Sequence, residues 1–299
     1  MNIIMRRIDF LATDGIILNG LLYETDKKSN KVILAVHGMS SNCFKKRDEV
    51  ISSFANNSGI AYFCFNNRGS ELAKYIRKNI DGKNEKILGG TTYEDVLEGY
   101  EDIVGAILKL KELGYDEIYL QGHSLGCTKI VYTYNELKTD NDELLKNIKG
   151  IILLSLIDIP KALKIYLGNK FENYISLAEE KEKAGLGKEL MPKDAFIHTI
   201  CVKTFLRYAR DNKDIDFAKY GEDTQLETLN EIDVPIFMRW GNNNEMIVQK
   251  AEELVSIVSN ILQNPNKDID YIDEADHGYT DKEEELAKQI VNFLQKYNN

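Results

Sequence analysis

The residues whose types and spacing most clearly suggest chemistry are Gly122-His123-Ser124-Leu125-Gly126. They follow a strand-like run, Glu117 to Gln121, and lead into a helix-like run, Cys127 to Asn135. A serine in such a turn is held in a strained backbone conformation, and glycines on both sides let the strand and the helix pack closely around it. The pattern predicts that Ser124 is a nucleophile. The alternative is a glycine-rich turn with an ordinary surface serine.

A serine hydroxyl needs a histidine to take its proton during acyl transfer. His277 fits this role best, because its loop, Asp273 to Gly278, follows the last expected strand and precedes the last expected helix. The alternative for His277 is a loop histidine without a role. The other histidines are His37 directly after a strand, His123 inside the serine turn, and His198 in an inserted segment.

An acid is also needed to hold the imidazole in the useful tautomer. The loop from Trp240 to Ile247 should leave the preceding strand, and Glu245 is its only carboxylate. Aspartate is commoner in this role, and Asn244 stands where one would be expected. Glu245 could instead be a carboxylate favoured by a helix N-terminus. Asp158, which follows an earlier strand, is the reserve candidate, whereas Asp233 precedes its strand and should lie at the wrong end.

Charge that develops on a carbonyl oxygen requires backbone N–H donors. Leu125 follows the serine at a helix N-terminus, and Met39 follows His37-Gly38 at the end of a buried strand, so their amides are predicted to form an oxyanion hole. The His37-Gly38 turn could also be merely structural.

Three further residues are candidates for the substrate pocket. Arg68 could line its mouth, although an ion pair on the rim of the sheet is the simpler interpretation. His37 and His123 are the other two candidates. His37 directly follows a strand and precedes a glycine, and His123 stands next to Ser124.

Strand-like and helix-like segments alternate along most of the chain. Asp14-Gly15 between two alternating segments is a strong hairpin signal, and the later strands are continuous apolar runs typical of burial on both faces. We therefore expect an α/β fold with a mostly parallel sheet flanked by helices, and ligands at the carboxyl ends of its strands. The expected strands are Arg7 to Thr13, Ile16 to Tyr23, Lys31 to Val36, Ala61 to Phe65, Glu117 to Gln121, Lys149 to Leu156, Val234 to Trp240 and Asp268 to Ile272, and the main helices are Asp48 to Asn57, Tyr93 to Leu113 and Asp281 to Tyr297.

One stretch interrupts this alternation. Residues 160–232 have helical signals but no convincing strand, so we expect a helical cap inserted into a core formed by residues 1–159 and 233–299. Aromatic residues of the cap could line a pocket, although packing is the simpler role for each of them.

Composition limits the kinds of partner. A formal net charge of -10 disfavours nonspecific binding to nucleic acid or to an anionic membrane surface. The apolar runs are too short to cross a bilayer, the first ten residues lack the apolar region of a signal peptide, and four scattered cysteines suggest reduced thiols, so a cytoplasmic location is expected. The sequence has no phosphate-binding, dinucleotide or H-E-x-x-H motif, and we expect no cofactor and no metal.

The ordered motifs resemble the α/β-hydrolase superfamily. These motifs are His37-Gly38, Asn67-Arg68-Gly69, Gly122 to Gly126, the acid loop and Ala275-Asp276-His277-Gly278. The resemblance covers nearly the whole chain and is greatest to carboxylesterase-like members. It implies an eight-stranded sheet, a cap between the sixth and seventh strands, a covalent acyl-enzyme and no cofactor. The family's haloalkane dehalogenases have aspartate in place of Ser124, which argues against that chemistry.

The expected function is hydrolysis of a small or medium carboxylic ester, with a small-molecule ester as the partner. The same residues would support a thioesterase, an acyltransferase or a carbon–carbon hydrolase. A noncatalytic ligand-binding member of the fold is the alternative from a different class.

Overall fold

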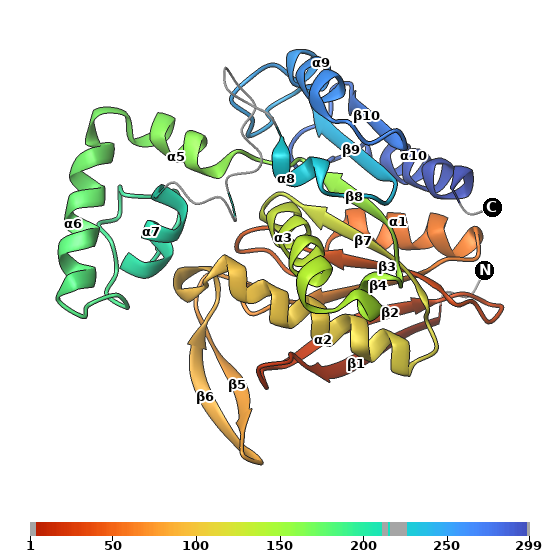
Figure 1. Cartoon of the computed structure of the whole chain (residues 1–299), viewed down its shortest axis with the longest axis horizontal. Coiled ribbons are helices and arrows are strands. Elements are labelled where there is room, and N and C mark those ends of the chain that lie inside the picture. Colours follow the sequence, from red (N-terminus) through yellow and green to blue (C-terminus); the bar gives the residue numbers. More distant parts are fainter. Residues whose placement is uncertain (1–3, 211–214, 216–225, 298–299) are drawn as a thin grey trace.

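The centre of the protein is an eight-stranded sheet, seen in a computed structural model that describes residues 4–210, 215 and 226–297 (Figure 1). The spatial order is β1-β2-β4-β3-β7-β8-β9-β10, and every neighbouring pair in it is parallel except β1–β2 and β2–β4. This confirms the expected fold class, with the ends of the strands shifted by a few residues. The strands are β1 (Ile4–Leu11), β2 (Ile17–Glu24), β3 (Lys31–Val36), β4 (Ala61–Asn66), β7 (Glu117–His123), β8 (Ile148–Leu154), β9 (Ile236–Gly241) and β10 (Lys267–Ile272).

Helices cover both faces of the sheet, which explains why its central strands are continuously apolar. In β3, Val32, Ile33 and Leu34 are all fully buried. Helices α1 and α10 pack on one face, and α2, α3 and α9 pack on the other. Their bounds are α1 (Lys46–Asn57), α2 (Gly99–Glu112), α3 (Leu125–Asp140), α9 (Ala251–Ile261) and α10 (Glu283–Lys296), and the short α4 (Asp142–Leu145) follows α3.

The predicted start of the second main helix is wrong. In place of one helix from Tyr93 to Leu113, the chain forms two short turns, η1 (Thr91–Tyr93) and η2 (Val96–Glu98), before α2 begins. Glu94 between them is extended, and the side chain of Asp95 accepts a hydrogen bond from Leu97 N–H. This capping interaction starts a new turn there and interrupts the helical pattern.

A hairpin absent from the sequence-based prediction projects from the molecule in Figure 1. Its strands are β5 (Lys74–Ile80) and β6 (Lys83–Gly89), joined at Asp81-Gly82. Both turn residues have positive φ, 49° and 81°, as a two-residue hairpin turn requires. The Asp-Gly pair was the available signal, but the flanking residues are too polar to show a clear strand pattern.

The segment between β8 and β9 contains helices α5 (Ile159–Leu167), α6 (Phe171–Lys183), α7 (Val202–Ala209) and α8 (Glu227–Asn230), and the short turn η3 (Gly168–Lys170). Side chains of α5, α6 and α7 form an apolar cluster that also includes Val96 and Leu125 of the core. These helices therefore pack next to the serine turn. The division into a core and a cap of residues 160–232 stays a prediction, and 211–214 and 216–225 lie outside the described residues.

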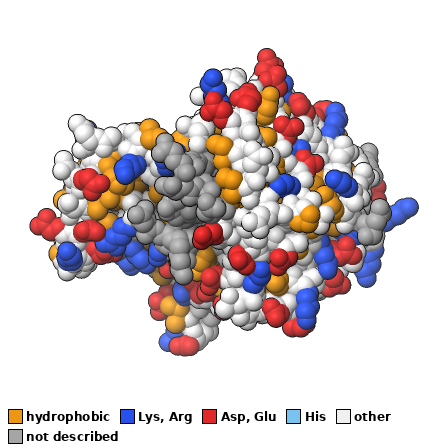
Figure 2. All heavy atoms as spheres, turned by 45° about the horizontal axis from the view of Figure 1, so that its top comes forward, with side chains coloured by type: hydrophobic (Ala, Val, Ile, Leu, Met, Phe, Trp, Pro, Cys, Tyr) orange, Lys and Arg blue, Asp and Glu red, His pale blue; other side chains and the backbone are white. Residues whose placement is uncertain are grey.

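The surface is polar and mixed in charge. Figure 2 shows Lys and Arg side chains lying among Asp and Glu side chains on the face it displays. Within the described ranges, no helix combines the length and the apolar character needed to cross a membrane.

A buried ion pair holds the turn after β4 against α2. Arg68 Nε and Nη2 lie 2.9 and 2.8 Å from Asp102 Oδ1, and the Arg68 backbone N–H donates to Asp102 Oδ2 at 2.7 Å. The two side chains are 4% and 0% exposed. The paired geometry compensates for removing both charges from water, so loss of one partner would leave the other uncompensated.

We expect Arg68→Met to lower the free energy of unfolding by about 3 kcal/mol or more, because Asp102 would remain buried without its cation. Urea unfolding followed by the fluorescence of the single tryptophan, Trp240, would measure this change. Arg7→Met is the control, since the Arg7–Asp9 pair is 69% and 58% exposed and should contribute less than about 1 kcal/mol. Equal effects of the two substitutions would contradict this account.

Candidate active site

Ser124 occupies a strained turn between β7 and α3. Its φ is 55° and its ψ is -124°, a conformation that non-glycine residues rarely adopt. The neighbouring glycines are required by close packing: a Cβ on Gly122 would lie 2.6 Å from the backbone of Cys127, and one on Gly126 would lie 2.2 Å from Val36 O. The sequence around Ser124 therefore forms the sharp strand-to-helix turn that its pattern predicts.

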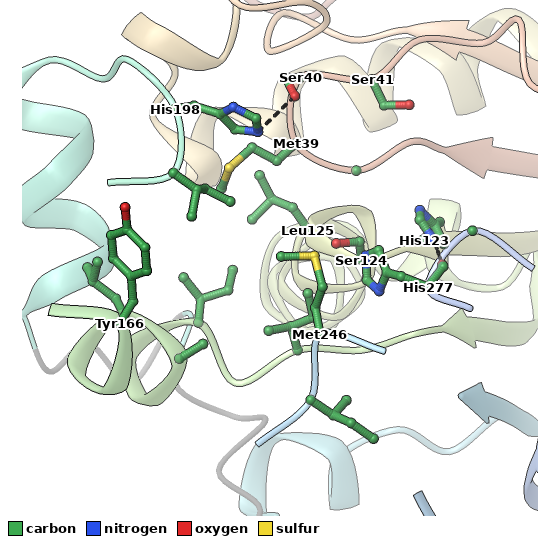
Figure 3. Close-up of a pocket in the computed structure, with 18 of the residues that line it drawn as sticks. Met39, Ser40, Ser41, His123, Ser124, Leu125, Tyr166, His198, Met246 and His277 are labelled. Atoms are coloured by element: carbon green, nitrogen blue, oxygen red, sulfur yellow. Dashed lines mark hydrogen bonds between the residues drawn. The ribbon is translucent and has the colours of Figure 1, made fainter. Parts of the chain in front are cut away.

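The loop after β3 passes close to this serine. A Cβ on Gly38 would lie 2.9 Å from Ser124 Cβ and 3.0 Å from His123 O, so glycine permits the approach. Neither the Met39 nor the Leu125 backbone N–H donates a hydrogen bond to any described residue. Two unused donors thus flank Ser124, one from each loop, and Figure 3 shows both residues beside it.

His277 and Glu245 are in direct contact. His277 Nδ1 and Glu245 Oε1 form a hydrogen bond, which leaves Nε2, on the opposite side of the ring, available to another partner. The imidazole is one-fifth exposed and the carboxylate is buried. Both residues come from loops that follow neighbouring parallel strands, β10 and β9.

Glu245 is fixed by more than the histidine. Its Oε2 accepts hydrogen bonds from Gly241 N–H at 3.0 Å and Ser155 Oγ at 2.7 Å, and its Oε1 accepts one from Met246 N–H at 2.9 Å. Burial acts to raise the pKa of Glu245, but the His277 side chain and the donors from Gly241 and Ser155 lower that pKa below its usual value. The carboxylate is therefore held in the ionised form that can stabilise an imidazolium.

His123 supports the loop that carries His277. Its Nε2 lies 2.7 Å from the His277 carbonyl oxygen, so this nitrogen must carry the proton and donate. Burial and the charge of Arg47 lower the pKa of His123 well below its usual value. The neutral ring fixes the backbone of His277 and also lines the cavity described next.

Ser124 and His277 face one cavity of about 900 Å³ (Figure 3). No hydrogen bond joins Ser124 Oγ to His277 in the described part of the chain. The remaining wall is largely apolar and includes Ile157, Leu163, Tyr166 and Met246. Within ranges 4–210, 215 and 226–297, no group of three or more His, Cys, Asp and Glu side chains is placed to hold a metal ion.

Two residues predicted for the substrate pocket lie elsewhere. His37 is buried beside the cavity, where its Nδ1 contacts Gly38 O at 2.8 Å and its Nε2 accepts from Asn67 N–H, and burial lowers its pKa to about 3. Arg68 does not line the cavity, because its side chain forms the ion pair with Asp102. An ion pair was the simpler interpretation of Arg68 from the sequence. His123 is the one of the three that lines the cavity.

The reserve acid has a different position. Asp158 caps the N-terminus of α5, where its carboxylate accepts a hydrogen bond from Lys161 N–H at 3.1 Å. No described contact joins Asp158 to His277, whereas Glu245 touches the imidazole. The geometry thus favours Glu245 over Asp158.

Sequence reasoning missed two polar residues near the site. Ser155, with φ of 52°, holds Glu245 and lies 3.1 Å from the Tyr279 hydroxyl. Ser40 Oγ lies 3.1 Å from His198 Nε2, which joins the loop of Met39 to the segment after α6 (Figure 3). A polar residue directly after an apolar strand was the only signal for Ser155, and the sequence held none for the Ser40–His198 contact.

Comparison with known proteins identifies the fold. No protein-family model and no curated protein matches the sequence, but solved structures match over almost its whole length. Est1E from Butyrivibrio proteoclasticus, solved with ferulic acid, is 16% identical with a TM-score of 0.67 over 96% of this chain and 98% of that one. The α/β hydrolase GrgF from Penicillium sp. sh18 is 15% identical with a TM-score of 0.68 over 98% and 99%, and the Pyrococcus furiosus esterase Pf2001 is 17% identical with a TM-score of 0.60 over 99% and 91%. The chain has the α/β-hydrolase fold.

The ionised Glu245 should make stability depend on pH. Because folding lowers the pKa of this carboxyl, its contribution is present above the unfolded pKa, ordinarily about 4.5, and is lost as pH falls through the folded value. We expect the difference in unfolding free energy between wild type and Glu245→Gln to be larger at pH 7 than at pH 4. Urea unfolding at the two pH values would test this, and a difference that grows on acidification would contradict it.

Proposed function

We propose that this protein is a serine hydrolase that cleaves a small or medium carboxylic ester through an acyl-enzyme at Ser124. The observation that carries the proposal is the Glu245–His277 hydrogen bond at the edge of a cavity that also contains a strained, glycine-flanked serine. A nucleophile, a base and an orienting acid from three loops then have one shared reaction space.

In the proposed mechanism, His277 Nε2 accepts the proton of Ser124 Oγ as that oxygen attacks the ester carbonyl. The Met39 and Leu125 amides donate to the oxyanion, and Glu245 stabilises the imidazolium that has formed. His277 then protonates the leaving alkoxide, which departs as the alcohol. Water, activated by the same imidazole, attacks the acyl-enzyme and releases the carboxylic acid and free Ser124.

Two features support an ester of modest size. The cavity of about 900 Å³ has the volume of a small-molecule site, and its wall is largely apolar. Among the similar structures, Pf2001 is an esterase by name, and Est1E was solved with ferulic acid. At such low identity these names support the class of reaction and leave the substrate to experiment.

The first test is hydrolysis of 4-nitrophenyl esters from acetate to decanoate without added metal. We expect turnover by the wild type and a loss of at least about 10³-fold in kcat for Ser124→Ala, because the nucleophile is absent. Release of 4-nitrophenolate measures the rate. Ser256→Ala, on the exposed surface of α9, is the matched control and should retain wild-type kcat.

Labelling with a fluorophosphonate gives an independent readout of the same nucleophile. Labelling without turnover would indicate a narrower substrate than the series provides. If the wild type neither turns over any ester nor becomes labelled at Ser124, the noncatalytic ligand-binding interpretation replaces the proposal.

The acid can be tested by comparing Glu245→Gln with Asp158→Asn. We expect Glu245→Gln to lower kcat by roughly 10²- to 10⁴-fold, because the imidazolium loses its balancing charge. Asp158→Asn should retain kcat, since the Asp158 carboxylate caps α5, whereas the Glu245 carboxylate contacts the imidazole. Steady-state kinetics on the best ester of the series would decide, and loss of kcat in Asp158→Asn alone would make the Glu245 assignment wrong.

A further inference from the structure

One end of the cavity is basic. Lys45, Lys46 and Arg47, at the start of α1, line it together with Ser124 and His277. The residue before α1, Lys45, makes no side-chain capping hydrogen bond to the helix. The free N–H groups of the first turn and the positive end of the helix dipole therefore add to the side-chain charges.

Arg47 is buried at this end, and its positive charge has only one weak partner in the described part of the chain. The residue is 6% exposed, and its Nε is buried with no hydrogen-bond partner among the described residues. Its single ion pair, to Asp48 Oδ1, is long at 3.5 Å, and that oxygen already accepts a hydrogen bond from the Tyr62 hydroxyl at 2.9 Å. Burying a charged N–H donor such as Nε without an acceptor is unfavourable.

The neighbouring charged side chains do not cancel the positive charge at this end of the cavity. Lys46 is paired with Glu283 at 3.0 Å and approaches Asp281 at 3.8 Å, so its charge is compensated. Lys45 has no ion pair among the residues that the structure describes, and it is exposed. Asp48 is the only carboxylate paired with Arg47 in those residues. Arg47 and Lys45 therefore remain as cations that a ligand can engage.

A narrow void beside Arg47 does not supply the missing acceptor. Arg47 borders a narrow void together with Gln121, whose Oε1 is also buried without a hydrogen-bond partner. This void has no room for a water molecule, so Arg47 Nε and Gln121 Oε1 have no partner there. The larger cavity, which Arg47 also lines, is where an acceptor for the guanidinium can enter.

Arg47 lines the same cavity as the reacting groups Ser124 and His277. His123, whose ring lies 4.9 Å from the His277 ring, centroid to centroid, lines that cavity too. An ester bound with its carbonyl at Ser124 can therefore extend another group toward Arg47 within the same cavity.

We propose that Arg47, aided by Lys45 and the start of α1, binds a carboxylate on the substrate, so that the preferred ester carries a second acid group, as a monoester of a dicarboxylic acid does. The planar guanidinium matches the two oxygens of a carboxylate, and such charge-assisted bonds are stronger than neutral ones. This inference rests on the proposed function, because the ester must also reach Ser124.

Two esters of nearly equal size test the proposal. Mono-4-nitrophenyl succinate differs from 4-nitrophenyl butyrate by a carboxylate in place of the terminal methyl group. We expect Arg47→Gln to lower the ratio of kcat/KM for the succinate over the butyrate by at least about tenfold, because a charge-assisted hydrogen bond is lost only with the succinate. The ratio is the readout because a general effect of the substitution on Ser124 or His277 would change the values for both esters alike.

Three further variants serve as controls. Arg7→Gln removes the same charge at an exposed site on β1 and should leave the ratio unchanged. Arg47→Lys keeps the charge but not the planar fork, so an intermediate ratio is expected. Lys45→Gln changes an exposed side chain and should lower the ratio less than Arg47→Gln does, which gives a readout even if Arg47→Gln folds poorly.

A binding measurement separates this proposal from the proposed function. Ser124→Ala protein, with and without Arg47→Gln, would be titrated with monomethyl succinate by calorimetry. If the wild type hydrolyses butyrate but the ratio is the same in Arg47→Gln, the carboxylate site is wrong and the esterase proposal stands. If no ester is hydrolysed, binding that depends on Arg47 supports the site alone, and binding that does not depend on Arg47, or no binding, overturns it.

Discussion

The close contact of three backbone segments around Ser124 is the constraint on which the rest of the site depends. Strand β7 turns into α3 at a residue with positive φ, and the turn after β3 lies against the same side chain. Only glycine fits at Gly38, Gly122 and Gly126, because a Cβ at each would lie within 3.0 Å of another atom. The strain at the serine persists because buried packing on both sides of the sheet holds the three segments in place.

The parallel sheet brings the other groups to this point. Loops that follow β9 and β10 carry Glu245 and His277, and Ser155, directly after the adjacent β8, holds the carboxylate. Residues far apart in the sequence thus meet at one edge, since neighbouring parallel strands end on the same side. The helices between β8 and β9 add apolar wall, and the start of α1 adds a basic end to a cavity whose wall is largely apolar.

The sequence allowed the sheet and the proposed triad to be predicted, because buried strands such as β3 are continuous apolar runs and glycines mark the turn at Ser124. It did not allow contacts that arise only from packing to be predicted. Arg68 is directed away from the cavity by Asp102, and His37 is enclosed by Gly38 and Asn67. The β5–β6 hairpin was missed because its strands are polar, and the basic end of the cavity was missed because Lys45 to Arg47 look like an ordinary surface run.

Glutamate in place of the commoner aspartate has a consequence in conformational entropy. Glu245 has one more rotatable bond than aspartate, and a longer side chain loses more rotamer freedom when it is fixed. Donors from Gly241, Ser155 and Met246 restrict this extra freedom, so the carboxylate is aligned before any imidazolium forms. An aspartate here would be one methylene short of His277 and would leave these donors without their acceptor. Glutamate and its three donors therefore form a unit, and an exchange to aspartate would require the surrounding loop to be rebuilt.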